Sequence, residues 1–169
     1  RDNWKANVAF ASEGLEFSIN AYLWPLFMFM LAIGFSEMGG IVSFSLLASG
    51  FFMLYVGRIS DTRDRPWLLK VGSGWTAISW ILKAFVVNPF DALLAHSIYR
   101  VSRSAASIPF QTFLYEKAGN KQEEADEYMI MRQVLIGAVQ FVFFAVLAIV
   151  YFVFPDVPLK ITFLAAAVL

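Results

Sequence analysis

Long apolar stretches follow one another along nearly the whole chain, with only short polar sequence between them. An α-helix rises about 1.5 Å per residue and the hydrocarbon core of a bilayer is about 30 Å thick, so about 20 mainly apolar residues cross it. Six stretches meet or approach this length, at about 8 or 15 to 34, 38–59, 67–87, 90 to about 115, about 127–154, and from 158 onward. The sequence therefore predicts an all-α polytopic membrane bundle of six transmembrane helices.

The composition excludes several classes of function. Charged residues make up 15% of the 169 residues, whereas a soluble domain usually carries about 25%. The 13 basic and 13 acidic residues give a net charge of zero, so no basic face is available for a nucleic acid. The chain has no Cys, one His, and no nucleotide-binding or hydrolase motif. We therefore expect no enzymatic activity, no metal site and no cofactor.

Basic residues gather on one side of the predicted bundle. The start of the chain and the connections after the second and fourth stretches carry Arg1, Lys5, Arg58, Arg63, Arg65, Lys70, Lys117, Lys121 and Arg132. The opposite side carries only Lys83 and Lys160. By the positive-inside rule, the N-terminus lies on the cytoplasmic side, and the protein is integral to the cytoplasmic membrane.

The two ends of the sequence suggest a piece of a longer polypeptide. The chain starts at Arg1 without a Met and stops at Leu169 within an apolar run. We expect residues 1–169 to form one six-helix transmembrane bundle that is truncated at both ends.

Proline and small residues predict local features of the first two helices. Trp24-Pro25 predicts a kink in the first helix, because proline removes a backbone donor. Small residues in the second helix predict close contacts with neighbouring helices. These residues are Gly39, Gly40, Ser43, Ser45, Ala48, Ser49, Gly50 and Gly57.

The connection between the second and third helices carries the most specific motif. Residues 57–69 read GRISDTRDRPWLL, with Gly57, Asp61 and Arg65 spaced four residues apart. This resembles the loop signature of the major facilitator superfamily, in which Gly, Asp and Arg occupy the same spacing at the same place. The sequence departs from the family pattern at Asp64, where Gly is usual, and at 66–67, where basic residues are usual.

The chemistry of this loop predicts a conformational gate. Gly57 would end a helix at a close contact, and Asp61 would accept free N–H groups at a helix N-terminus. Arg65 offers a planar fork for a carboxylate on an adjacent loop. Glu116 and Arg132 are the expected partners of the loop. The alternative is a solvated charged turn, and we favour the gate.

The fourth helix carries a second resemblance. Residues 99–109 read YRVSRSAASIP, similar to the superfamily pattern of an Arg followed by small residues and a Pro. Arg100 matches the family Arg, and Ser104 replaces its usual Gly. Together the two resemblances imply half of a twelve-helix transporter. The Trp- and Lys-bearing segment before the first helix favours the C-terminal half.

Polar residues of the fourth helix form a stripe near the middle of the membrane. At 100° per residue, His96, Arg100, Arg103 and Ser107 fall within a narrow arc. Arg100 would lie about 15 Å deep and Arg103 about 20 Å deep at 1.5 Å per residue. An Arg facing lipid there costs at least about 2.5 to 3.5 kcal/mol, so the stripe must face the interior.

Two interpretations of the stripe remain open. In the structural one, Arg103 pairs with Glu13 or Glu16 of the first helix. In the functional one, Arg100 and Arg103 attract an anionic group of a substrate or act in ion coupling, with hydrogen bonds from Asn20 and Tyr22. His96 and Glu16 are the other candidates for substrate binding or coupling. His96 is expected to be packed rather than to relay protons, and Lys83 is expected to pair with Asp91 across the outer turn.

The predicted function is secondary active transport of a small solute. The resemblance implies two six-helix halves that rock about a midplane site and expose it to each side in turn. The expected partners are the lipid bilayer, a solute that is anionic in the functional interpretation, a coupling proton or other ion, and the other half of the polypeptide. The alternative is a non-transporting membrane receptor or assembly subunit, which would tolerate a sealed core, whereas a transporter needs a cavity that reaches Arg100.

Overall fold

The computed structural model describes residues 3–62, 65–119, 125–154, 156 and 158–168, and within these ranges it leaves out the side chains of 3, 5–6, 59–62, 65, 113–119 and 125–128. All secondary structure in these residues is helical. The elements are α1 (Asn3–Ser18), the π-helical turn η1 (Ile19–Leu23), α2 (Trp24–Met30), α3 (Phe35–Thr62), α4 (Arg65–Ala84), α5 (Pro89–Gly119), α6 (Ala125–Val153) and α7 (Lys160–Ala166). Because α1, η1 and α2 are continuous, the described residues form six helical rods, and the predicted all-α class is confirmed.

Two of these helices are by themselves long and apolar enough to cross a membrane. They are the segments Phe35–Arg58 in α3 and Met129–Val153 in α6. The sequence analysis predicted more spans than this criterion supports. Several other helices carry charged residues, such as Glu16 near the end of α1, Lys83 in the last turn of α4 and Arg103 in the middle of α5, and such residues lower their hydropathy.

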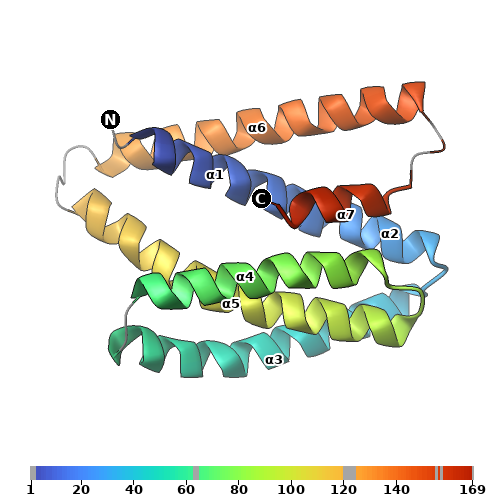
Figure 1. Ribbon diagram of the computed structural model, residues 1–169, viewed down its shortest axis with the longest axis horizontal. Coiled ribbons are helices and arrows are strands. Elements are labelled where there is room, and N and C mark those ends of the chain that lie inside the picture. The colour runs from blue at the N-terminus through green and yellow to red at the C-terminus, as the bar shows by residue number, and fades with distance from the viewer. Residues whose placement is uncertain (1–2, 63–64, 120–124, 155, 157, 169) are drawn as a thin grey trace.

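The helices form two groups, as Figure 1 shows. In one group α5 packs against both α3 and α4, and in the other α1 packs along α6. The short helix α7 contacts α4 and η1 and so links the two groups. The start of α1, the end of α3, the start of α4, the end of α5 and the start of α6 lie at one end of the bundle, which we call the N-terminal end. The connections after α2, α4 and α6 lie at the opposite end, which we call the tight-turn end.

The kink predicted at Pro25 takes the form of a π-helical turn. The Trp24 N–H donates to the carbonyl of Ile19, five residues earlier, directly before Pro25 at the start of α2. A π turn absorbs one extra residue, so the helix continues past the proline with an altered register. One consequence is that Asn20 lies in η1, at the middle of the bundle.

Aromatic side chains close the tight-turn end of the core. Trp24 and Phe27 of the first rod contact Phe163 of α7, with ring centroids 5.8 and 5.1 Å apart. Trp80 of α4 stacks on the same Phe163 at 5.9 Å. All four side chains are buried, so this part of the core is tightly packed.

Among the described glycines, Gly72 has the closest neighbouring backbone, where α4 packs against α5. A Cβ atom at Gly72 would lie 2.5 Å from the backbone nitrogen of Ala106. The prediction that the glycines of α3 make close contacts is wrong, because a Cβ at Gly39, Gly40, Gly50 or Gly57 would meet nothing within 4 Å. One serine of α3 does face a neighbour, since the Ser45 hydroxyl lies 3.1 Å from that of Ser97 on α5.

Candidate functional site

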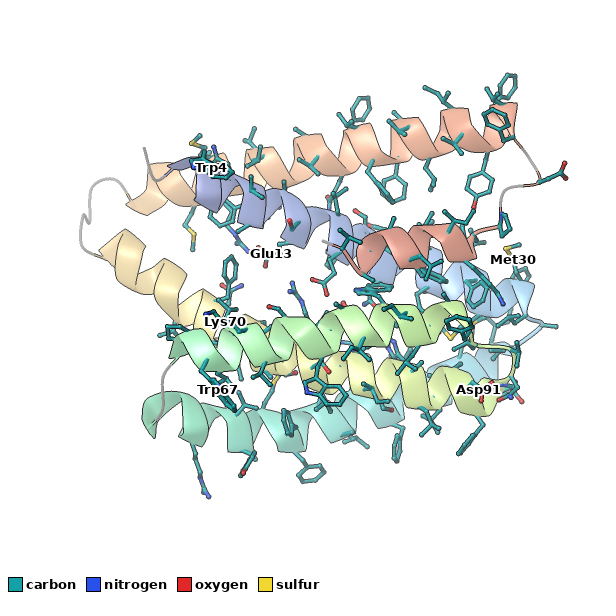
Figure 2. The ribbon with its side chains drawn as sticks, viewed as in Figure 1. Trp4, Glu13, Met30, Trp67, Lys70 and Asp91 are labelled. Atoms are coloured by element: carbon teal, nitrogen blue, oxygen red, sulfur yellow. The ribbon has the colours of Figure 1, made fainter. Side chains whose placement is uncertain are left out.

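A charged cavity lies between the two helix groups. Its volume is about 380 Å³, and α1, α4 and α5 supply most of its lining. Glu13 and Glu16 enter it from α1, Arg103 from α5, and Thr76 and Trp80 from α4. In Figure 2, Glu13 points from α1 toward the α4–α5 group.

The cavity extends from the middle of the bundle toward the N-terminal end. Its lining includes Val8 of α1, Leu69 of α4 and Phe110 of α5, each in the part of its helix nearest to that end. Trp80 belongs both to this lining and to the aromatic core at the tight-turn end. The cavity therefore ends where the aromatic core begins.

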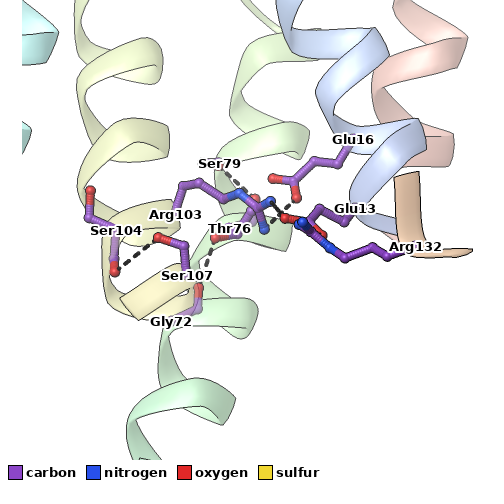
Figure 3. A network of polar contacts seen from close by, with 9 residues as sticks. All are labelled: Glu13, Glu16, Gly72, Thr76, Ser79, Arg103, Ser104, Ser107 and Arg132. Atoms are coloured by element: carbon purple, nitrogen blue, oxygen red, sulfur yellow. Dashed lines mark hydrogen bonds and ion pairs between the residues drawn. The ribbon is translucent and has the colours of Figure 1, made fainter. Parts of the chain in front are cut away.

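Four charged side chains from three helices form a continuous network at the cavity (Figure 3). Arg103 Nη1 lies 2.7 Å from Glu16 Oε2, and its Nη2 lies 4.0 Å from Glu13 Oε1. Arg132 of α6 donates from Nη2 to Glu13 Oε2 at 2.7 Å. Glu13 and Glu16 are three residues apart on α1, so both reach the same Arg. The predicted pairing of Arg103 with a glutamate of the first helix is confirmed.

The members of this network differ in their contact with solvent. Side-chain exposure is 31% for Arg103, 17% for Glu13 and Arg132, and 10% for Glu16. The two positive and two negative charges balance, which offsets the cost of removing them from water. One oxygen, Glu16 Oε1, is buried and has no hydrogen-bond partner.

The structure places Arg132 away from its expected position at the loop after α3. It lies in the first part of α6 and is directed toward α1, where it pairs with Glu13. Its Cζ atom lies 5.5 Å from the centroid of the Phe10 ring. Because α1 and α6 pack side by side, this residue meets α1 before it can reach the loop.

The other residues of the expected gate are only partly described. Gly57 is half-buried with open space beside it, and α3 continues five residues beyond it to Thr62. The prediction that Gly57 ends a helix at a close contact is therefore wrong. The side chains of Asp61, Arg65 and Glu116 lie outside the described residues.

Lys83 is a buried lysine whose environment the sequence analysis missed. Its side chain is fully buried, and Nζ donates to Asn20 Oδ1 at 2.9 Å. Nζ also lies 4.6, 4.0 and 3.7 Å from the ring centroids of Trp24, Trp80 and Tyr99. The expected ion pair with Asp91 is not formed, because this position of α4 faces η1 and the core rather than the turn. One sequence signal could have indicated this environment: Trp80 and Lys83 are three residues apart and so share a face of the helix.

The remaining predicted site residues divide between the interior and the surface. His96 is buried and stacks on Trp24, with ring centroids 5.8 Å apart, as expected for a packed residue. Tyr22 is exposed, and its ring packs against that of Phe144 with centroids 5.5 Å apart. Asn20 contacts Lys83 instead of an arginine.

Arg100 is half-buried and lines none of the described cavities. Its Nε is buried without a hydrogen-bond partner, and within the described residues it forms no ion pair with a carboxylate. The cavity thus reaches Arg103, one turn further along α5, and not Arg100.

Comparisons with known proteins leave the chain without an assigned family. No family model, no curated protein and no solved structure matches it. The functional argument therefore rests on the cavity and on the charges around it.

Proposed function

We propose that this chain is one six-helix half of a secondary active transporter of the major facilitator type, which moves a small polar solute across the cytoplasmic membrane. One observation carries the proposal. A cavity of about 380 Å³ is lined by Glu13, Glu16 and Arg103 in a chain that is 59% hydrophobic. Ionisable residues inside membrane-spanning helices are costly and usually mark a solute or ion pathway.

The outer surface supports a membrane setting. Large apolar side chains are exposed on α3 and α6, among them Phe51, Leu54, Phe141 and Phe152. Exposed apolar surfaces of this extent need a cover. In the proposal, lipid covers part of this surface and the second six-helix half covers the rest.

The shape of the cavity supports alternating access. It extends toward the N-terminal end, whereas aromatic side chains close the tight-turn end. With the N-terminal end in the cytoplasm, as the basic residues predict, this arrangement is an inward-facing one. The loop at 57–65 is the proposed gate of the opposite state.

The charge balance favours a solute with an anionic group. Arg100, which forms no ion pair with a carboxylate among the described residues, lies one turn along α5 from the balanced network of Arg103, Arg132, Glu13 and Glu16. A surplus of buried positive charge is stabilised when an anion binds nearby. The cavity reaches Arg103 and not Arg100, so the expected access to Arg100 is not met, and we take Arg103 as the arginine that faces the solute. A receptor or assembly subunit on this scaffold would need no such cavity.

The test is uptake by the full-length protein in liposomes. Vesicles are given a mixture of small carboxylates, phosphates, sugars and amino acids, and the retained solutes are identified by mass spectrometry. We expect saturable uptake of at least one solute, and a loss of at least tenfold in Arg103→Gln/Glu16→Gln, a pair of changes that leaves no unpaired charge. Gly74→Ala, on an open face of α4, is the matched control. Folded protein that takes up nothing beyond empty vesicles would contradict the proposal.

A further inference from the structure

An apolar groove runs along the outside of the helix group formed by α3, α4 and α5. Its volume is about 500 Å³. α3 and α4 both pack on α5 and much less on each other, so α5 forms the floor of the groove between them. Trp67 and Trp75 line it from α4 and are half-exposed, and Figure 2 shows Trp67 on the side of α4 toward α3. The charged cavity lies on the other face of α4, where Ser73 and Thr76 line it.

The walls of the groove offer almost no polar group to a ligand. The serines that line it from α5 already have partners, because the Ser102 hydroxyl donates to the Ile98 carbonyl at 2.7 Å and the Ser97 hydroxyl lies 3.1 Å from that of Ser45. Every other side chain of the lining is aliphatic or aromatic. A polar group placed in the groove would lose its hydrogen bonds to water without replacement, so the part of a ligand that enters it is a hydrocarbon.

The dimensions of the groove fit a hydrocarbon chain and not a helix. It follows α4 from Trp67 to Trp75 and α5 from Ser97 to Ala105, about 12 Å along each helix at 1.5 Å per residue. The volume of about 500 Å³ over this length gives a mean cross-section of roughly 40 Å². An α-helix with its side chains is about 10–12 Å across, which is a cross-section of roughly 80–110 Å². A helix of the second half, or of another copy of this chain, is therefore too thick to enter.

The groove occupies one half of the bilayer in the proposed membrane setting. It begins at Trp67, in the first turn of α4 at the N-terminal end, and reaches the middle of that helix at Trp75. Its length is close to half of the hydrocarbon thickness of about 30 Å. Membrane helices lie roughly along the bilayer normal, as lipid chains do. An acyl chain of the cytoplasmic leaflet therefore lies parallel to the groove and can enter it from the side.

Positive charge is in excess near the N-terminal end of the groove. Residues 57–70, which include the connection from α3 to α4, contain four basic and two acidic residues. Among them, the exposed side chains of Arg58 and Lys70 lie on the two helices that flank the groove. The headgroup of a lipid whose chain follows the groove lies at this end, and basic residues at a membrane surface attract anionic headgroups.

We propose that the groove binds one acyl chain of an anionic phospholipid from the cytoplasmic leaflet; this rests on the membrane setting of the proposed function. The chain lies on α5 and covers Trp67 and Trp75. The headgroup lies at the basic connection between α3 and α4. The lipid thereby fills the space between two helices that pack on α5 and much less on each other.

The test uses phosphatidylglycerol that carries a photoreactive diazirine group in the middle of one acyl chain. The full-length protein is reconstituted with this lipid in liposomes, irradiated and digested, and the labelled residues are identified by mass spectrometry. Phosphatidylcholine with the same chain, at the same mole fraction, is the comparison. We expect residues 67–75 and 97–105 to be labelled at least about fivefold more by phosphatidylglycerol, the effect of one basic residue near the membrane surface.

Variants that fill the groove separate this site from ordinary lipid contact. Val71→Phe on α4 and Val101→Phe on α5 each add bulk at a half-buried residue of the lining. Each should lower the labelling of the opposite wall by at least about tenfold, the effect of displacing two buried methylene groups. The two variants are independent, so either one carries the comparison if the other fails to fold. Leu82→Phe, at an exposed residue on the same face of α4 but outside the groove, is the matched control and should change nothing.

Three results would overturn the inference. Equal labelling of the groove by the two lipids would leave only ordinary boundary lipid there. Labelling that persists in the two groove variants would place the lipid elsewhere. An unlabelled groove beside a labelled outer face of α3 would mean that another protein segment covers the groove. Absence of label from the whole chain would instead contradict the membrane setting and with it the proposed function.

Discussion

Arg103 stands between two carboxylates of α1, so removing its charge leaves negative charge behind in the core. We expect Arg103→Gln to leave Glu16 without its ion-pair partner, which within the described residues is Arg103. The expected loss of folding free energy is roughly 3 kcal/mol, the lower end for breaking a buried ion pair, because Arg103 keeps 31% of its exposure. Thermal unfolding of the full-length protein in detergent measures this loss.

The double variant Arg103→Gln/Glu16→Gln completes this prediction. It should recover most of the lost stability, since no unpaired charge remains. Lys70→Gln, a change at an exposed residue of α4, is the control and should shift stability by less than about 0.5 kcal/mol. A double variant no more stable than Arg103→Gln would show that the ion pair does not hold these helices together.

At the residue scale, the sequence predicted one contact, the ion pair between Arg103 and α1, because the partners lie at similar depths in the bundle. Arg103 and the glutamates of α1 lie at similar depths in their helices, and their pairing followed from that. Lys83 could not be placed in the same way. Its environment combines Asn20, Trp24 and Tyr99 from separate elements, and which faces of those elements meet depends on the π-helical turn and on packing.

At the scale of single helices, Gly72 sets the distance between α4 and α5. We expect Gly72→Ala to lower stability by about 1 to 3 kcal/mol, the usual cost of overpacking, because its Cβ would meet the backbone at Ala106. Gly74→Ala, two residues further along the same helix, faces open space and should cost nothing or add up to about 1 kcal/mol. Unfolding of both variants in detergent compares them, and equal stabilities would refute the close contact.

Helix positions were predictable because apolar length and turn residues mark them directly. The turn before α5 is an example, where Asn88 Oδ1 accepts a hydrogen bond from the Asp91 N–H and Pro89 begins the helix. The glycines of α3 were misread because small residues permit a close contact without requiring one. Gly72 was not distinguished from them, since sequence does not tell which small residue has a neighbouring backbone opposite it.

At the scale of the whole molecule, the alternation of connections was predictable and the cavity was not. Basic and tight connections alternate along the sequence, and they lie at opposite ends of the bundle (Figure 1). The cavity depends on how the α1–α6 pair is placed relative to α3, α4 and α5, with α7 linking them. That placement results from packing between groups far apart in the sequence, which no local pattern encodes.

The central claim is that a charged cavity opens toward the cytoplasm in a membrane-spanning bundle. Sided labelling of single cysteines in the full-length protein, with an impermeant thiol reagent in intact cells and inverted vesicles, tests it most directly. Ser73→Cys should react only from the cytoplasmic side and Asn88→Cys only from the outside, whereas Ser79→Cys, buried on the same helix as Ser73, should react from neither. Reaction of Ser73→Cys and Asn88→Cys from the same side, or no reaction of Ser73→Cys from either side, would contradict the account.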